Sequence, residues 1–345
     1  MRKEKNHTRF ILLLVLALTC GLSSTNKLLA QDPVFSQYYN APLQLNPAFA
    51  GTSIAPIFSI NYRNEWPLWP RAYTTYAASY DQFFPTLNSG FGMNIMTDNA
   101  GDGIFKTTSI SGIYSYKIYI QKDLQIKFGI EATTTQSRLD WDRLIFFDQL
   151  DPSEGTGRGG PPPVSGEIRP ASLSKTYFDF SVGMLLYNAN YYGGITLKHI
   201  NTPDNSFLNE NDNVYAGLPM RVSLQFGSQI NIITDNKRGV TAFLSPNILL
   251  TKQSDLVQLN LGTLIGYNTV QMGVWYRHTF NNPDAVIGSI GVRKDLFRIS
   301  YSYDYTISDL AIQNTGGSHE IGVLINLERL YPQKNNYNDC FAIFR

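Results

Sequence analysis

The stretch LFRISYSYDY, residues 296–305, alternates apolar and polar side chains along its length. Successive side chains of a β-strand point to opposite faces, so this spacing predicts a strand with one apolar face and one polar face. The same alternation recurs in residues 124–132, 221–232, 257–265 and 320–327. Alternation does not orient the sheet, because a soluble sandwich would carry the same pattern with its apolar face inward.

Strand-like segments of about ten residues fill most of the chain, which is the length a tilted strand needs to cross a bilayer. We count about 14 segments, and an even number returns both ends of a barrel to the same side. They lie near 55–63, 71–81, 90–97, 105–120, 123–138, 175–187, 190–200, 220–233, 239–252, 255–267, 269–279, 284–294, 296–305 and 318–328. The predicted fold is all-β: a transmembrane antiparallel β-barrel of about 14 strands in the outer membrane, with both termini periplasmic.

The lengths of the connections predict which barrel end faces which compartment. If residues 64–70 lie outside the cell, the longest connections, 139–174 and 201–219, lie outside with them. The tight turns then face the periplasm, which is the arrangement found in outer-membrane barrels. One short connection near Ser254 is an exception on the outside. Residues 151–170 are rich in glycine and proline, which predicts an irregular, exposed loop.

The first 30 residues have the pattern of an export signal. Basic residues precede the apolar run 10–18, which is too short to span a bilayer. Cleavage after Ala30 is favoured over lipidation of Cys20, because Leu18 lies one place too close to the cysteine for a good lipobox. The segment therefore directs export and is then removed.

Four regions follow from these patterns. We expect a signal peptide at 1–30, an N-terminal periplasmic plug or docking segment at 31–54, the barrel at 55–330 and a C-terminal periplasmic tail at 331–345. No later apolar stretch is long enough for a transmembrane helix, so membrane insertion would use strands.

Composition narrows the functional classes. With 21 Tyr and 20 Phe among 345 residues, the chain suits aromatic girdles, although composition alone leaves a soluble secreted β-protein equally open. The 28 basic and 27 acidic residues nearly cancel, so no nucleic-acid partner is expected. Removal of the signal would leave Cys340 as the single cysteine, which offers no intramolecular disulfide.

The expected mature chain begins with QDPVFSQYYNAPLQLNPAFAGT, residues 31–52. This start, and several later motifs, resemble the PorP/SprF family of type IX secretion and gliding-motility membrane proteins. The matching residues are Gln31, Asp32, Pro33, Phe35, Ser36, Gln37, Tyr38, Pro42, Asn46, Pro47, Ala48, Gly51, Tyr62, Arg63, Trp66, Pro67, Asp98 and Gly101, with SYDYTISDL (302–310) and GGSHEIGV (316–323). One departure is Phe341, which follows Cys340 where relatives have proline and leaves the role of that cysteine open.

The resemblance implies a non-enzymatic outer-membrane component of the type IX secretion or gliding machinery. Such a protein helps export or surface attachment of a secreted adhesin-like protein. The implied partners are outer-membrane lipid, the secreted client and periplasmic components of the machinery, and no cofactor is implied. The alternative is an outer-membrane diffusion or uptake channel, in which the polar strand faces line a pore.

Two regions are candidate docking sites for protein partners. Three prolines between residues 31 and 51 fix φ and remove hydrogen-bond donors, which predicts an extended, non-strand segment that plugs the periplasmic mouth or docks a partner. The long loops carry further aromatic side chains, which either bind a client or fold the loops onto the rim. The candidate docking residues are Phe35, Gln37, Tyr38, Trp141, Phe146 and Phe207.

Charged residues on the polar strand faces are predicted to point into the lumen. Their mixed signs favour ion pairs that fill the interior over a water-filled selectivity filter. These candidate lumen charges are Arg221, Arg277, Arg298, Asp304 and Glu320.

A catalytic role for His319, beside Glu320, is disfavoured. The chain has no Gly-x-Ser-x-Gly motif and no His-x-x-x-His metal spacing, so nothing pairs this histidine with a nucleophile or a metal. A structural histidine is the better interpretation. We therefore assign no catalytic, cofactor-binding or metal-binding residue.

Overall fold

A computed structural model describes residues 32–69, 72–121, 123–150, 164–207, 217–235, 240–280, 282–308, 315–330 and 340–344. The predicted signal peptide, Gln31 and most of the predicted tail lie outside these residues. Within the described ranges, no helix is both long and apolar enough to cross a membrane.

Strands make up most of the described chain, and the few helices are short. The strands are β1 (Ile57–Glu65), β2 (Tyr73–Phe84), β3 (Ser89–Ala100), β4 (Phe105–Gln121), β5 (Leu124–Leu139), β6 (Ser174–Tyr187), β7 (Tyr191–Lys198), β8 (Arg221–Ser228), β9 (Ile230–Asp235), β10 (Val240–Gln253), β11 (Leu256–Tyr267), β12 (Val270–Thr279), β13 (Asn282–Lys294), β14 (Phe297–Thr306) and β15 (Ser318–Asn326). The helices are α2 (Pro42–Leu45) and the 3-10 turns η1 (Pro47–Phe49), η2 (Pro85–Leu87), η3 (Trp141–Arg143), η4 (Phe147–Gln149), η6 (Leu327–Leu330) and η7 (Ala342–Phe344).

The strands form one closed antiparallel ring. Apart from β8 and β9, each strand pairs with its neighbours in the chain, and β15 pairs with β1 to close the barrel. Because β8 and β9 both pair with β10 and are separated only by Gln229, the 15 segments occupy 14 positions in the ring. The predicted fold and strand count are confirmed.

The break between β8 and β9 has a local cause in the facing strand. Pro246 of β10 lies between the part that pairs with β8 and the part that pairs with β9. Proline has no N–H to donate to the ladder, so pairing stops opposite it. Gln229, at the break, instead donates its N–H to the carbonyl of Asn190 at 2.8 Å.

Burial along the strands orients the sheet, which alternation alone left open. In β14, Phe297 and Ile299 are 50% and 56% exposed on the outer face, whereas Arg298 and Asp304 are 1% exposed on the inner face. A water-soluble protein would bury the apolar set. The polar interior and apolar exterior are instead those of a barrel whose solvent is lipid.

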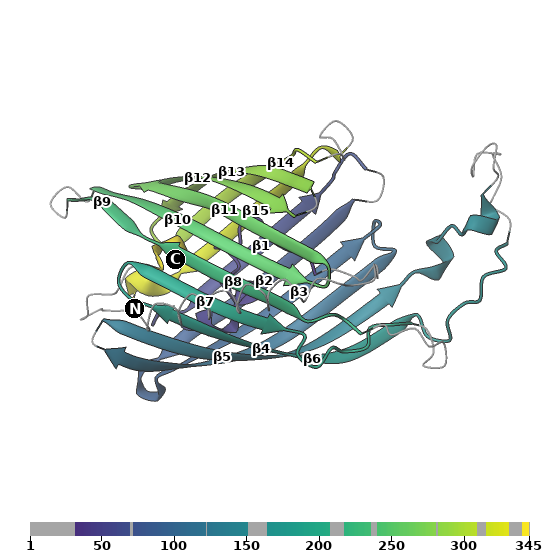
Figure 1. Cartoon of the computed structure of the whole chain (residues 1–345), viewed down its shortest axis with the longest axis horizontal. Coiled ribbons are helices and arrows are strands. Elements are labelled where there is room, and N and C mark those ends of the chain that lie inside the picture. The colour runs from purple at the N-terminus through teal and green to yellow at the C-terminus, as the bar shows by residue number, and fades with distance from the viewer. Residues whose placement is uncertain are drawn as a thin grey trace, which may run out of the picture. The chain divides into compact units, whose positions relative to one another are not determined.

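The two ends of the barrel differ in their connections (Figure 1). We call the end at which β5 connects to β6 and β7 connects to β8 the loop end, and the opposite end the turn end. The turn end joins strands through short connections such as 85–88, 188–190 and 268–269. The connection at Ser254 is short and lies at the loop end, as predicted.

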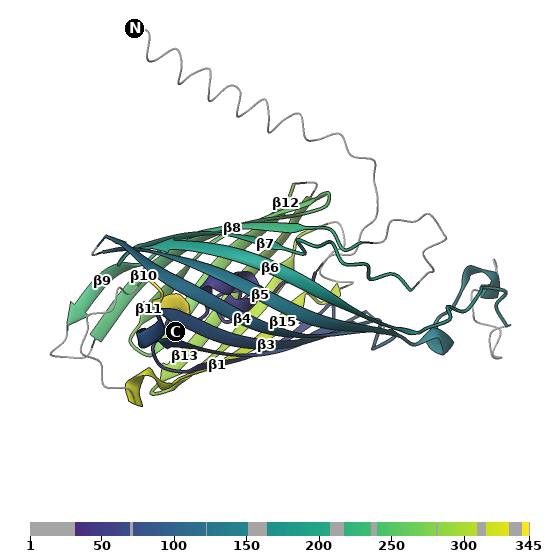
Figure 2. The ribbon, with the colours of Figure 1, turned by 90° about the horizontal axis from the view of Figure 1, so that it is seen from below.

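The segment from Asp32 to Pro56 lies inside the barrel (Figure 2). Asp32 contacts His199 at the loop end, whereas Pro56 accepts a hydrogen bond from Leu327 at the turn end. The segment therefore runs the length of the lumen, rather than closing one mouth as predicted. About 25 partly extended residues are long enough for this path.

The ends of the described chain lie at opposite ends of the barrel. Asp32 is at the loop end, and Cys340–Phe344 lie among side chains of the turn end. The sequence-based expectation placed both termini at one mouth, because an even strand count does that for the first and last strands. It cannot account for a segment that crosses the lumen before β1 begins. The side of the membrane on which each terminus lies stays a prediction.

Candidate functional site

The lumen segment, which we define as residues 32–56, is held in the barrel by side chains of the wall. Its sequence favours this, because its prolines prevent it from adding a strand to the sheet. Pro42 and Pro47 instead start α2 and η1, and Asn46 caps η1 by accepting a hydrogen bond from the N–H of Ala48 at 2.8 Å. Nearly all of the segment is buried.

Glu320 of β15 anchors the segment near the loop end. Its two carboxylate oxygens accept hydrogen bonds from the N–H groups of Ser36, at 2.8 Å, and Gln37, at 3.0 Å. The side-chain amide of Gln37 also donates to the hydroxyl of Ser302 at 3.0 Å. Backbone donors that would be orphaned inside a barrel are thus paired with a charged acceptor, the stronger kind of hydrogen bond.

Buried charges of both signs meet at this anchor. Arg63 lies 3.2 Å from the carboxylates of both Asp304 and Glu320, and Arg277 lies 2.9 Å from Asp304. The hydroxyl of Ser36 donates to Asp304 at 2.6 Å. The two arginines thus face the buried carboxylates of Asp304 and Glu320, and each also contacts a more exposed carboxylate, Glu65 or Asp284. Removal of one buried member would leave its partner less well paired.

A second polar cluster surrounds Asp32 at the loop end. Its carboxylate is 2.7 Å from Nε2 of His199 and accepts a hydrogen bond from Arg221 at 3.1 Å. The other ring nitrogen of His199 contacts Asp179 at 2.8 Å. Burial alone would lower the pKa of His199, but the two carboxylates outweigh it and raise the pKa to about 9. The histidine is therefore a cation at neutral pH.

Glycines in the wall make room for the segment. Gly129 of β5 and Gly183 of β6 are directly paired and face inward. A Cβ atom on Gly129 would lie 2.3 Å from the backbone nitrogen of Ala48, and one on Gly183 would lie 1.9 Å from Oδ1 of Asn46. These approaches are too close for any other residue, so the wall and the segment fit each other at this point.

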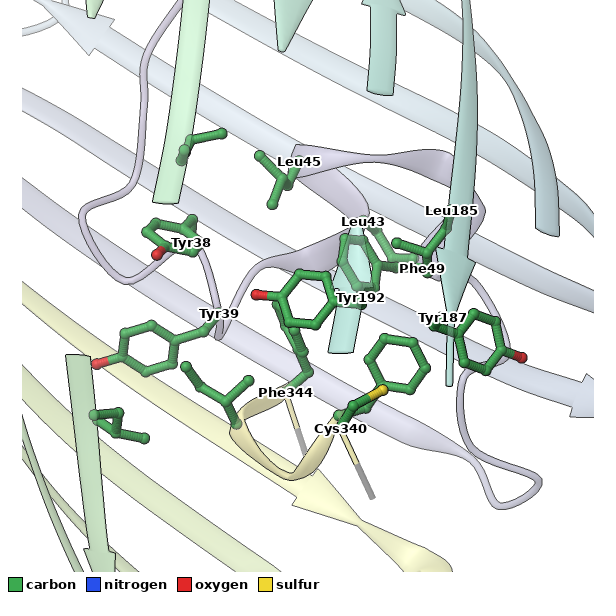
Figure 3. Close-up of a cluster of buried hydrophobic side chains, with 14 of the residues drawn as sticks. Tyr38, Tyr39, Leu43, Leu45, Phe49, Leu185, Tyr187, Tyr192, Cys340 and Phe344 are labelled. Carbon is green, nitrogen blue, oxygen red and sulfur yellow. The ribbon is translucent and has the colours of Figure 1, made fainter. Parts of the chain in front are cut away.

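Apolar side chains fill the lumen towards the turn end (Figure 3). Phe49 of the lumen segment packs on Phe344, with ring centroids 4.6 Å apart, and Phe344 lies 5.4 Å from Tyr192. Tyr39 stacks on Trp275 at 5.3 Å. Cys340 is fully buried in the same cluster. The N-terminal and C-terminal parts of the chain thus share one core inside the barrel.

The candidate docking residues divide into two groups. Phe35, Gln37 and Tyr38 lie in the lumen and are 5%, 1% and 6% exposed, so they form no surface while the segment is in place. Trp141 and Phe146 lie on the loop between β5 and β6, with ring centroids 4.7 Å apart.

Phe207, the remaining docking candidate, lies 6.1 Å from the ring of Phe105 at the start of β4. This contact folds part of the connection between β7 and β8 back towards the barrel wall. A partner that binds Phe207 would therefore also contact the adjacent rim of the barrel.

The five candidate lumen charges are all buried, but they do not form one cluster. Arg277, Asp304 and Glu320 meet at the anchor of the lumen segment, and Arg221 belongs to the Asp32 cluster. Arg298 donates to the carbonyl of Ile343, at 2.6 Å, and to the side chain of Asn40 at 2.6 Å.

Sequence reasoning missed Arg63, Asp32, His199 and Asp179 as members of these clusters. Asp32 and Arg63 belong to motifs that carry the family resemblance, and membership in those motifs is the signal that could have identified them. Nothing local marks His199 or Asp179. Among the described residues, no three His, Cys, Asp or Glu side chains are placed to hold a metal ion.

A closed 14-strand barrel with an apolar outer face and a polar, occupied lumen defines an outer-membrane β-barrel protein. The family model described as "Type IX secretion system membrane protein PorP/SprF" matches residues 28–325. The chain therefore belongs to the PorP/SprF family and is an outer-membrane component of type IX secretion. The family describes a secretion component and not a class of enzyme.

Solved structures with similar barrels are distant in sequence. The Ralstonia pickettii toluene transporter TbuX is 10% identical, with 83% of this chain and 92% of that chain covered and a TM-score of 0.48. Omp33 of Acinetobacter baumannii is 8% identical, with 79% and 98% covered and a TM-score of 0.41. BamA from Haemophilus ducreyi is 11% identical, with 79% and 70% covered and a TM-score of 0.37.

No curated protein matches the chain in sequence.

Proposed function

We propose that this barrel is a non-enzymatic holder that helps export or surface attachment of a secreted adhesin-like protein. The observation that supports this is the lumen segment, which fills the barrel with buried polar contacts such as those of Ser36 and Gln37 with Glu320. A barrel built for free diffusion has no need of such an anchor. A barrel that presents its loop end to a partner gains rigidity from it.

The loop end is the docking surface in this proposal, and it faces the cell exterior. Support comes from the long connections gathered at this end, since outer-membrane barrels carry their longer loops outside. On the connection between β5 and β6, Phe147, Val164 and Ile168 are 90%, 99% and 89% exposed. Exposed apolar side chains on a loop provide contact area for a protein partner.

The turn end faces periplasmic components of the secretion machinery in the same proposal. Phe35, Gln37 and Tyr38 lie nearer the loop end and are buried, so they become docking residues only if a partner draws the lumen segment out. The predicted C-terminal tail, 331–345, is the candidate on the turn-end side, since Phe344 packs in the turn-end core.

The second candidate function is a diffusion or uptake channel. Its support is the set of inward polar atoms that have no hydrogen-bond partner among the described residues, including Oγ1 of Thr196 and both amide atoms of Gln225. Water in the lumen would pair such atoms, and a continuous water path along the lumen would also conduct ions. Planar-bilayer recording decides between the two functions. The holder predicts little or no steady current, and a large, stable conductance from purified protein would favour the channel.

Deletion of the gene, followed by comparison of cell-surface proteins, tests the holder function in cells. We expect loss of one or a few secreted proteins from the surface, and affinity capture of the tagged barrel should recover the same proteins. Phe147→Ser should weaken the capture without affecting barrel folding. Tyr119→Ser is the matched control, because Tyr119 is a 56% exposed aromatic residue at the turn end. Equal capture by wild type and both variants would count against docking on this loop.

A further inference from the structure

The side chain of Asp32 occupies a built site at the loop end of the lumen. His199 and Arg221 both contact its Oδ2 atom, and the N–H of Asp32 donates to Oε1 of Gln253 at 3.2 Å. The side chains of His199 and Arg221 are each 10% exposed, whereas that of Asp32 is 17% exposed. The site thus binds one carboxylate and one backbone amide, the two groups that an acidic residue in an extended chain presents.

The barrel wall holds this site in shape without help from Asp32. Asp179 of β6 contacts Nδ1 of His199 and so fixes the ring with Nε2 directed at the ligand. His199 itself has a φ of 59°, a left-handed conformation that is uncommon for a residue with a side chain. The Nε of Arg221 is buried and has no hydrogen-bond partner among the described residues. This unpaired donor leaves room in the site for one more acceptor atom.

Charge makes the site specific for an anion. With Asp32 in place, Arg221 faces its carboxylate at 3.1 Å; without it, Arg221 has no carboxylate within ion-pair distance among the described residues. The neighbouring Lys198 is 3.2 Å from Glu131 and therefore does not change this pairing. A buried unpaired cation is costly, so the empty site would favour another carboxylate.

We propose that this is a carboxylate-binding site for an acidic, extended polypeptide segment, and that Asp32 occupies it as an internal substitute for that segment. Asp32 lies next to the expected start of the mature chain, so it can leave the site without breaking the barrel ladder. Only the identity of the incoming segment, as part of a secreted client at the loop end, rests on the proposed function. Carboxylate binding itself does not.

Chemical rescue of the full-length barrel carrying Asp32→Ala tests the site. The variant should have a lower thermal unfolding temperature than wild type, and sodium formate or acetate should raise it more than sodium chloride at equal ionic strength. A ligand present at 100 times its Kd stabilises the folded state by about 2.7 kcal/mol, which sets the scale of the rescue. Equal effects of acetate and chloride would overturn the proposal.

A second variant keeps this test decisive. Asp81→Ala removes another buried carboxylate, which accepts a hydrogen bond from Gly51 at the turn end, and it should show no preference for acetate. If Asp32→Ala does not fold, Asp32→Ser, whose small polar side chain leaves room for formate, replaces it in the same comparison. Rescue of Asp81→Ala to the same degree would show that acetate acts without a specific site.

A labelled peptide tests recognition of polypeptide. Because residues 33–56 of the variant still fill the lumen, the probe is short: we expect the labelled peptide GDG to bind the Asp32→Ala barrel at least about tenfold more tightly than GNG, and fluorescence anisotropy measures the difference. Equal binding would refute recognition of an acidic segment. These assays use no client, so they can succeed where capture from cells fails. The converse result, client capture without acetate rescue, would retain the proposed function and reject this site.

Discussion

Glu320→Gln tests how the lumen segment is anchored. The substitution keeps the shape of the side chain but removes its charge and replaces one acceptor oxygen with an NH2 group. In wild type, both oxygens accept backbone N–H groups, from Ser36 and Gln37, and Arg63 lies 3.2 Å away. In the variant, the N–H of either Ser36 or Gln37 faces the new NH2 group, which is also a donor. Arg63 then keeps Asp304 as its one buried carboxylate partner.

The magnitude follows from the contacts that are lost. A hydrogen bond to a charged group contributes about 1.5–3 kcal/mol, and a buried donor left unpaired costs about as much. We therefore expect the segment to be held about 3 kcal/mol less tightly. Each 1.4 kcal/mol is a factor of ten, so local opening should become roughly 100-fold more frequent.

Hydrogen exchange of the barrel in nanodiscs measures this opening. The amides of Ser36 and Gln37 should exchange about 100-fold faster in Glu320→Gln, while amides of the β4–β5 ladder remain protected. Glu65→Gln is the matched control, because Glu65 is 33% exposed and only its 3.4 Å contact with Arg63 is lost. We expect less than about a fivefold change there. Exchange at Ser36 and Gln37 that matches wild type in Glu320→Gln would refute the anchoring role of this carboxylate.

Gly129→Ala should lower the unfolding temperature, since its Cβ would lie 2.3 Å from the backbone of Ala48, whereas Gly112→Ala, with open space around it, should not. Phe344→Ala should destabilise the turn-end core by about 3–5 kcal/mol, which chemical unfolding would measure, and a loss below 1 kcal/mol would contradict that packing. The pKa of His199 is raised from 6.5 to about 9 in the folded protein. Protonated His199 therefore adds at most about 3 kcal/mol to the free energy of unfolding. This stabilisation is fully present below pH 6.5 and is lost as the pH rises through 9. Unfolding temperatures of wild type and His199→Gln should therefore differ at pH 6 and converge by pH 10, and a constant difference would argue against this linkage.

The strands could be predicted because their signal is local. A period of two in residues such as 296–305 arises from the geometry of one strand, whichever strands flank it. The direction in which Arg298 and Phe297 point could not be predicted in the same way, because the two faces are exchanged between a soluble sandwich and a membrane barrel. Length, loop asymmetry and the export signal supplied that information indirectly.

The lumen clusters could be predicted only in part, because their members are distant in sequence. Ser36 and Glu320 are separated by 284 positions, and Asp32 and Arg221 by 189. Prolines did predict that residues 31–51 form no strand. They could not predict the end at which the segment enters, since that depends on cross-strand register and on the inward glycines that accommodate its backbone.

The place of the anchor in the ring links the lumen segment to closure of the barrel. The ring closes where the last strand, β15, pairs with the first, β1. Gln37 contacts Ser302 and Glu320 on one side of that seam, and Arg63 reaches Glu320 from the other side. Glu320 belongs to β15, Asp304 to β14 and Arg63 to β1, so one buried ion-pair group joins three strands that the chain brings together last. Loop-closure entropy makes this the most costly pairing in the sheet. Ser36 and Gln37 of the lumen segment thus provide hydrogen-bond partners for the polar side chains that become buried when β14, β15 and β1 come together.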